Sequence, residues 1–117
     1  MNPILIPFES AVQLPRFHTK AGEHFIDLGR IVYLKAQLNY TIFYLADGEQ
    51  VVTSLSLGSY VALLESRGFL RLHKSYLLNL HYLPQCSLKS NHQLVLPDGK
   101  RAIIARRRRA MVKKIIR

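Results

Sequence analysis

The chain has 117 residues, 49% of them hydrophobic, and a net charge of +10, which fits one domain with one modest core and excludes a second domain. Its apolar runs all fall short of the roughly 20 residues that cross a bilayer. The N-terminal run is interrupted by Pro3 and Pro7 and has no basic segment before it. We therefore expect neither a membrane span nor a signal peptide.

The positive charge is concentrated at the C-terminal end. Residues 1–99 contain eight Lys or Arg and seven Asp or Glu, whereas residues 100–117 contain nine Lys or Arg and no acid. A nearly neutral body with a basic end indicates a surface for polyanions, with nucleic acid as the first candidate and anionic lipid as the second. A solvated basic tail without a partner is the alternative, although nine uncompensated charges on a small domain repel one another.

The residue types that carry catalysis or hold metals do not form recognisable motifs. Cys86 is the single cysteine, which excludes an internal disulfide and indicates the reducing cytoplasm. The five histidines are scattered without metal-ligand spacing, and the chain has neither a Gly-rich phosphate loop nor a nucleophile elbow. We expect no enzymatic activity, no metal, no cofactor and no small-molecule substrate.

The first half of the chain predicts an arm followed by antiparallel strands. Residues 1–15 contain three prolines and predict an irregular N-terminal arm, so that the domain itself spans residues 16–117. A small hairpin is expected over residues 17–19 and 24–28. Further strands are expected over residues 30–36, 41–45 and 49–54, the last two joined by a tight turn at Asp47-Gly48.

In the second half of the chain, the spacing of apolar residues changes from that of a strand to that of a helix. Apolar residues spaced i, i+3, i+4 and i+7 predict a helix over residues 55–67, with Ser54 or Ser56 as its cap and Gly68 just beyond its end. Strands are expected over residues 69–74, 76–79, 82–89, 92–96 and 101–104, the last two joined by a turn at residues 97–99. The predicted fold class is mainly β, with antiparallel sheets and two short α-helices.

The segment Phe69–Asn79, FLRLHKSYLLN, alternates in a way that singles out Lys74. In an extended strand Arg71, His73 and Ser75 share one face, whereas Lys74 interrupts an otherwise apolar row on the other face. Considered alone, His73 fits a structural role and Lys74 fits solubility.

The tetrad Arg106-Arg107-Arg108-Arg109 precedes a helical pattern in which Met111, Val112, Ile115 and Ile116 share one face. A helix beginning at Ala105 would place Arg108 among these apolar residues, so the helix is expected to begin inside the tetrad. The first arginines then lie on a loop and helix N-terminus, where phosphates bind readily. Residues 37–40, QLNY, form a second candidate, because Asn and Gln can contact adenine; plain solvent-exposed loop is the alternative.

Together these segments resemble the LytTR-type DNA-binding domains, known as output domains of LytR/AlgR-type bacterial response regulators. IVYLKAQLNYTIFYLADG resembles the family's first core strand, its NYT loop and its Asp-Gly hairpin. SLGSYVALLESRGFLRLHKSYLLNL resembles the helix and following strand, and LPDGKRAIIARRRR the closing hairpin and basic stretch. The similarity covers residues 16–117, in order and with compatible spacing.

The resemblance implies a LytTR-like elongated sandwich of antiparallel sheets that inserts loops into successive major grooves of double-stranded DNA. It implies base contacts from Asn39 or Tyr40, from Lys74 and from Arg107. The neighbouring residues that would contact the DNA backbone or support the site are Arg71, His73, Ser75, Arg106 and Arg108. A second copy on an adjacent direct repeat is the further partner that the resemblance implies.

Three departures from the family pattern accompany this resemblance. The 117 residues leave no room for a receiver domain, so control by phosphorylation is not assumed. Ile103, Ile104 and Ala105 stand where the family has a Pro-Val-Ser-like segment, which removes a serine hydroxyl. Lys74 lacks the bidentate fork of an arginine. The sequence therefore predicts a stand-alone transcription regulator, with a module whose basic helix binds an acidic protein or an anionic membrane surface as the alternative.

Overall fold

The computed structural model describes residues 16–19 and 22–116, with side chains from Ile26 onward. The predicted arm, residues 1–15, lies outside the described residues. The strands are β1 (Arg16–Thr19), β2 (Gly22–Phe25), β3 (Ile31–Gln37), β4 (Tyr40–Leu45), β5 (Gln50–Thr53), β6 (Phe69–His73), β7 (Tyr76–Asn79), β8 (Ser87–Ser90), β9 (Gln93–Val95) and β10 (Arg101–Ile103). The α-helices are α2 (Leu57–Leu64) and α3 (Arg109–Ile116), and short 3-10 helices are η1 (Leu28–Arg30), η2 (Glu65–Arg67), η3 (Leu80–Gln85) and η4 (Arg106–Arg108).

The strands form two antiparallel sheets. The larger sheet has seven strands in the order β2-β1-β5-β4-β3-β7-β6, and the smaller sheet has three in the order β10-β9-β8. Neighbours in the chain are mostly neighbours in the sheet, because tight turns join them. The predicted class, mainly β with antiparallel sheets and two α-helices, is confirmed.

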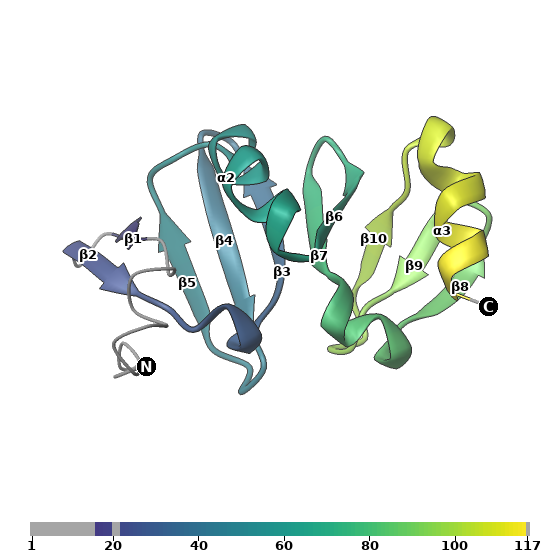
Figure 1. Cartoon of the computed structure of the whole chain (residues 1–117), viewed down its shortest axis with the longest axis horizontal. Helices are drawn as coiled ribbons and strands as arrows, with labels where there is room; N and C mark the ends of the chain where they lie inside the picture. The colour runs from purple at the N-terminus through teal and green to yellow at the C-terminus, as the bar shows by residue number, and fades with distance from the viewer. Residues whose placement is uncertain (1–15, 20–21, 117) are drawn as a thin grey trace.

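Two apolar clusters, one on each face of the larger sheet, hold the fold together. Alternation along β4 directs Phe43 and Leu45 to a cluster that includes α2, and directs Tyr44 to a second cluster with the smaller sheet and α3. Figure 1 shows α2 against the larger sheet, the smaller sheet beyond β6, and α3 on the far side of the smaller sheet. The molecule measures 39 × 30 × 25 Å along its principal axes.

Helix α2 begins and ends close to its predicted bounds. Ser56 is the N-cap, but its side chain makes no capping hydrogen bond and its Oγ instead lies 3.2 Å from that of Ser59. The helix tightens into η2 and ends at Gly68, whose φ of 89° is in the left-handed region that glycine adopts without steric cost. None of the helices in the described part of the chain is long and apolar enough to span a membrane.

The strand expected over residues 82–89 is wrong. Residues 82–89 are not one strand, because η3 occupies Leu80–Gln85 and only Ser87–Ser90 is extended. The buried Asn79 side chain explains this: its Oδ1 accepts a hydrogen bond from the His81 N–H and starts the helical turn. In the segment 69–79 the first strand ends at His73, one residue before its expected end, and Lys74 and Ser75 form the turn between β6 and β7.

The apolar face expected on α3 is only partly buried. Val112 is fully buried and Ile116 packs against the second cluster, whereas Met111 and Ile115 are exposed. The physical reason is that the small sheet is narrow and covers one side of the helix only.

Candidate nucleic-acid interface

Three connections lie side by side along one edge of the molecule, which is the upper edge in Figure 1. They are the β3–β4 turn at residues 38–39, the β6–β7 turn at residues 74–75 and the segment 105–108 after β10. Two backbone hydrogen bonds tie them together: Ala36 N–H donates to the Ser75 carbonyl at 2.9 Å, and Ala105 N–H donates to the Leu72 carbonyl at 2.7 Å. We call this surface the basic edge.

The β6–β7 turn is held by side chains of its own hairpin. Arg71 Nε donates to the His73 carbonyl at 2.9 Å, and Arg71 Nη2 donates to the Lys74 carbonyl at 2.7 Å. The backbone N–H of Ser75 donates to Nδ1 of His73 at 3.1 Å. Arg71 and His73 therefore fix the turn, and the exposed side chain of Lys74 is the group that the turn presents to solvent.

Electrostatics agrees with these roles for Arg71 and His73. Burial lowers the pKa of Arg71, and Arg108 lowers it further. Glu65 raises this pKa and Arg107 lowers it by a smaller amount, so the tetrad and the β6–β7 turn lie close enough to interact electrostatically. Burial, followed by Lys74 and Arg71, lowers the pKa of His73. The imidazole is therefore neutral near pH 7 and can accept the Ser75 hydrogen bond through Nδ1.

The tetrad divides into exposed and anchored arginines. Arg106 and Arg107 are exposed, Arg108 is half-buried, and Nε of Arg109 donates to the Ile104 carbonyl at 3.3 Å. The segment starts as the 3-10 helix η4 and becomes α3 at Arg109, so the helix begins inside the tetrad as predicted. The two exposed guanidiniums project from the start of the last helical segment.

The β3–β4 turn carries the remaining predicted residues. Asn39 is exposed at the turn, and Tyr40 pairs with Gln37 and is 43% exposed. The residue before Asn39, Leu38, has a φ of 55° and is 92% exposed. A leucine in this conformation costs about 1–2 kcal/mol relative to a right-handed one, so this position is strained.

Sequence reasoning missed two parts of this edge. Lys35 lies on β3 with its Nζ 5.9 Å from the centre of the Tyr76 ring, next to the β6–β7 turn. The turn between β8 and β9 is the other part, because the His92 carbonyl accepts from the N–H of Ile104 and a 280 Å³ groove beside it is lined by Asn91 and Arg109. The interruption of an apolar strand by Lys35 was a usable signal, whereas nothing in the sequence places residues 90–92 near Ile104.

No acidic side chain within residues 26–116 forms an ion pair at the basic edge, although Glu65 acts electrostatically on Arg71. Within residues 26–116 the ion pair that forms, Arg30 with Asp47 at 2.8 Å, lies at the β4–β5 turn on the opposite end of the larger sheet. No group of His, Cys, Asp or Glu in the described residues could hold a metal ion. The edge can therefore attract anions, and it offers a lysine and two arginines at separate points.

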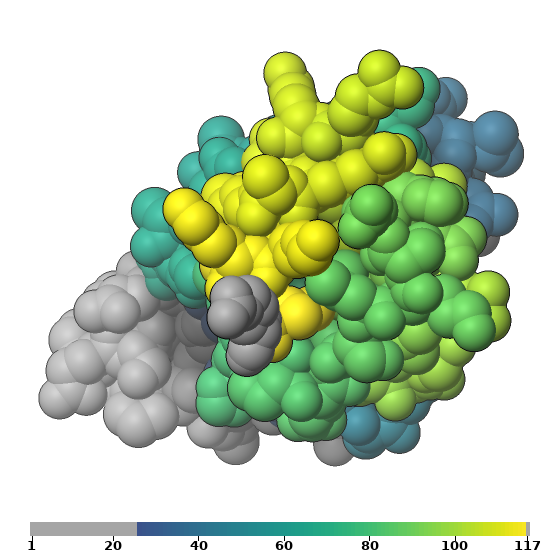
Figure 2. Space-filling view, turned by 90° about the vertical axis from the view of Figure 1, so that its right-hand side faces the viewer, coloured from purple at the N-terminus to yellow at the C-terminus, as the bar shows by residue number. Residues whose placement is uncertain are grey.

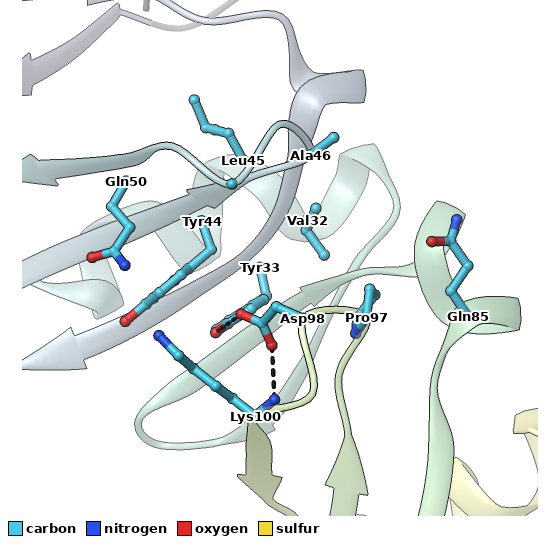
Figure 3. A pocket seen from close by; sticks show the side chains of 11 residues that line it. Val32, Tyr33, Tyr44, Leu45, Ala46, Gln50, Gln85, Pro97, Asp98 and Lys100 are labelled. Atoms are coloured by element: carbon cyan, nitrogen blue, oxygen red, sulfur yellow. Dashed lines mark hydrogen bonds between the residues drawn. The ribbon is translucent and has the colours of Figure 1, made fainter.

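The opposite end contains a cleft of about 320 Å³ between the two sheets, shown in Figure 3. Tyr33 Oη donates to Oδ2 of Asp98 at 2.8 Å, and Oδ1 of the same carboxylate accepts from the Lys100 N–H at 2.9 Å. Nζ of Lys100 lies 4.7 Å from the centre of the Tyr44 ring, which stacks on Tyr33. These contacts join Tyr33 and Tyr44 of the larger sheet to Asp98 and Lys100 beside the smaller sheet. They therefore fix the position of the two sheets relative to each other.

Basic connections gathered along one edge of two antiparallel sheets are what a nucleic-acid-binding domain requires. The comparisons with known proteins also identify a DNA-binding domain. A model of the LytTr DNA-binding domain matches residues 22–117. One solved structure, the LytTr DNA-binding domain of a protein described as a methyl-accepting/DNA response regulator from Bacillus cereus, has a TM-score of 0.67 at 18% identity, covering 88% of this chain and 95% of that chain. At this identity the structural similarity concerns the fold. The search for curated relatives finds no match.

The family match spans most of the chain and includes every residue of the basic edge. The chain belongs to the LytTR family, and its domain is a DNA-binding domain.

Proposed function

We propose that this chain is a sequence-specific transcription regulator that binds double-stranded DNA in the cytoplasm of a bacterium. The observation that carries the proposal is the basic edge, where three connections from both sheets lie together and contain exposed polar and cationic residues. Phosphate contacts would supply most of the affinity and base contacts the selectivity.

The order of the three connections along the basic edge supports contact with more than one groove. The β3–β4 turn and the tetrad belong to different sheets, with the β6–β7 turn between them. We infer that the outer two connections enter successive grooves, and that a second copy can bind an adjacent direct repeat.

The contacts of each residue support different roles at the basic edge. Lys74 and Arg107 are exposed and are proposed to contact bases together with Asn39 or Tyr40. Arg106 is proposed to contact phosphate, because it lies beside Arg107 on η4. Arg71, His73 and Ser75 are proposed to support the site through the hydrogen bonds described above. Arg108 is proposed to support it through its charge, which acts on Arg71.

Selection of bound duplexes from a random pool tests this proposal. The expected result is enrichment of one sequence, present as a direct repeat when two copies bind. Anionic vesicles serve as the competing target, because the exposed Met111 and Ile115 beside Lys113 and Lys114 could equally serve an anionic membrane surface. Binding to vesicles without enrichment of any duplex would overturn the proposal.

The Arg107→Ala variant tests the assignment of a base contact. We expect it to weaken binding to the selected duplex by about 1–3 kcal/mol, with a smaller loss on random duplex. Arg106→Ala is the matched control, because it removes the same charge from the adjacent position of η4. Equal losses on both duplexes would make Arg107 a phosphate contact instead.

A further inference from the structure

Leu38 occupies a backbone conformation that its side chain disfavours. It is the one non-glycine residue with a positive φ in the described part of the chain, at 55°. Two-residue hairpin turns normally place Gly, Asn or Asp at such positions, since these residues adopt them with little cost. Asn39 is the next residue in the turn and has a negative φ. The favoured residue type is therefore present in the turn, but leucine holds the strained position.

Packing within the domain does not explain this leucine. Its side chain is 92% exposed, the highest exposure among the large apolar residues of the described chain. The strands pair as far as Gln37 with Tyr40, so the turn is short and the position of its tip is fixed. In Figure 2 the tip of the β3–β4 hairpin, in blue, projects at the upper right beyond the surrounding surface.

The tip projects from the basic edge, the surface proposed above to face DNA. Asn39, exposed beside Leu38, can donate and accept hydrogen bonds, whereas the leucine side chain can make only apolar contacts. On the major-groove side of the base pairs, the C5-methyl group of thymine is the apolar group on offer. Leu38 can therefore recognise a base only through an apolar contact with that methyl group.

We propose that Leu38 is a specificity-determining residue that contacts a thymine methyl group in the major groove. This inference rests on the proposed function, and it adds to it the identity of one recognised base. Strain at the tip is the cost of placing an apolar group where a glycine or asparagine would otherwise stand. The favourable contact forms only on a duplex that carries thymine at the matching position.

Replacement of thymine by uracil tests the contact without altering the protein. In the selected duplex each dT is replaced singly by dU, which removes the methyl and leaves all hydrogen-bonding groups in place. Binding is measured by fluorescence anisotropy at fixed salt. One position is expected to lose about fourfold in affinity, the factor that corresponds to one buried methyl group. If no dU position weakens binding, the inference is overturned.

Two variants connect the effect to Leu38. In Leu38→Gly, which removes both the side chain and the backbone strain, the dT-to-dU effect is expected to disappear while the melting temperature rises. In Leu38→Met, which keeps an apolar side chain, the effect is expected to remain. A dU effect that persists in Leu38→Gly assigns the methyl contact to another residue and overturns the inference.

The failure of this inference can be distinguished from the failure of the proposed function. If the protein binds selected and scrambled duplexes equally, sequence-specific recognition itself is wrong. If it prefers the selected duplex but tolerates dU at every position, the proposed function holds and the role of Leu38 is wrong.

Discussion

Adjacent residues of the β6–β7 hairpin have different tasks despite similar chemistry. Arg71 and Lys74 are both cationic, but the Arg71 guanidinium is engaged with the carbonyls of His73 and Lys74, whereas the Lys74 side chain is exposed. A charged side chain whose donors are used inside the protein has few left for a ligand. At the residue scale, Arg71 determines the shape of the turn, and the exposed Lys74 is free to make the proposed contact with DNA.

The two cations should therefore respond differently to truncation. Arg71→Ala is expected to lower the free energy of unfolding by about 1–3 kcal/mol, because two charge-assisted hydrogen bonds are lost. Lys74→Ala is expected to change stability by less than about 0.5 kcal/mol and to weaken DNA binding. Urea unfolding and anisotropy titration measure the two effects. Arg67→Ala, on η2 at the other end of β6, is the control for loss of charge alone. A stable Arg71→Ala protein would show that the turn does not need the guanidinium.

His73 gives the domain a dependence on pH with a defined sign. Its folded-state pKa is lowered by burial, Lys74 and Arg71, so the unfolded chain binds the proton more tightly. The stability that this histidine contributes is complete above the ordinary pKa of about 6.5 and is lost as the pH falls below that value. We expect the melting temperature of wild type to fall between pH 7.5 and 5.5.

His73→Asn isolates this contribution, because an asparagine Oδ1 can accept the Ser75 hydrogen bond but does not titrate. The fall in melting temperature over the same pH range should be smaller in this variant. An identical pH profile for wild type and variant would assign the dependence to other groups.

At the scale of elements, strong local patterns were predictable from the sequence. The Asp47-Gly48 turn, the helix stop at Gly68 and the start of the last helix inside the tetrad all depend on neighbours in sequence. The 3-10 helix η3 was not predictable from hydrophobic pattern, because it depends on a buried Asn79 side chain that also donates to the Ile31 carbonyl at 2.8 Å.

The candidate site was predictable only in part for the same reason. Residue types identified Lys74 and the tetrad, but the contact of Ala105 with Leu72 joins segments more than 30 residues apart. The strain at Leu38 also depends on strand register, which sets the length of the turn. Long-range pairing is thus the information that a local reading of the sequence lacks.

The role of the hydrogen bond between Leu72 of β6 and Ala105, just before the tetrad, can be tested with Ala105→Pro. Ala105 has a φ of −60° and a ψ of 142°, which proline adopts without strain, but proline lacks the N–H that donates to Leu72. We expect a loss of stability of about 1–3 kcal/mol and weaker binding to the selected duplex. Ala105→Gly, which retains the N–H and adds no hydrogen-bonding side chain, is the control and should bind the selected duplex as wild type does. Unchanged binding by Ala105→Pro would show that this hydrogen bond does not position the tetrad.

At the scale of the whole molecule, the two ends differ in structure and in charge. One end holds the two sheets together through Tyr33, Asp98 and the stacked Tyr44, and it also carries the Arg30–Asp47 ion pair. The other end is the basic edge. Because the sheets are fixed at the first end, the connections at the second end keep a constant spacing, and the proposed contact with two grooves needs such a spacing.

The central claim, that the basic edge binds a specific duplex through its phosphates and bases, is tested most directly by anisotropy titration at several salt concentrations. On the selected duplex, the logarithm of the association constant should fall linearly with the logarithm of salt concentration, with a slope of about −3 to −4.5 for three to five phosphate contacts. The scrambled duplex should bind more weakly at every salt concentration. A slope near zero, or equal affinity for the two duplexes, would contradict the account.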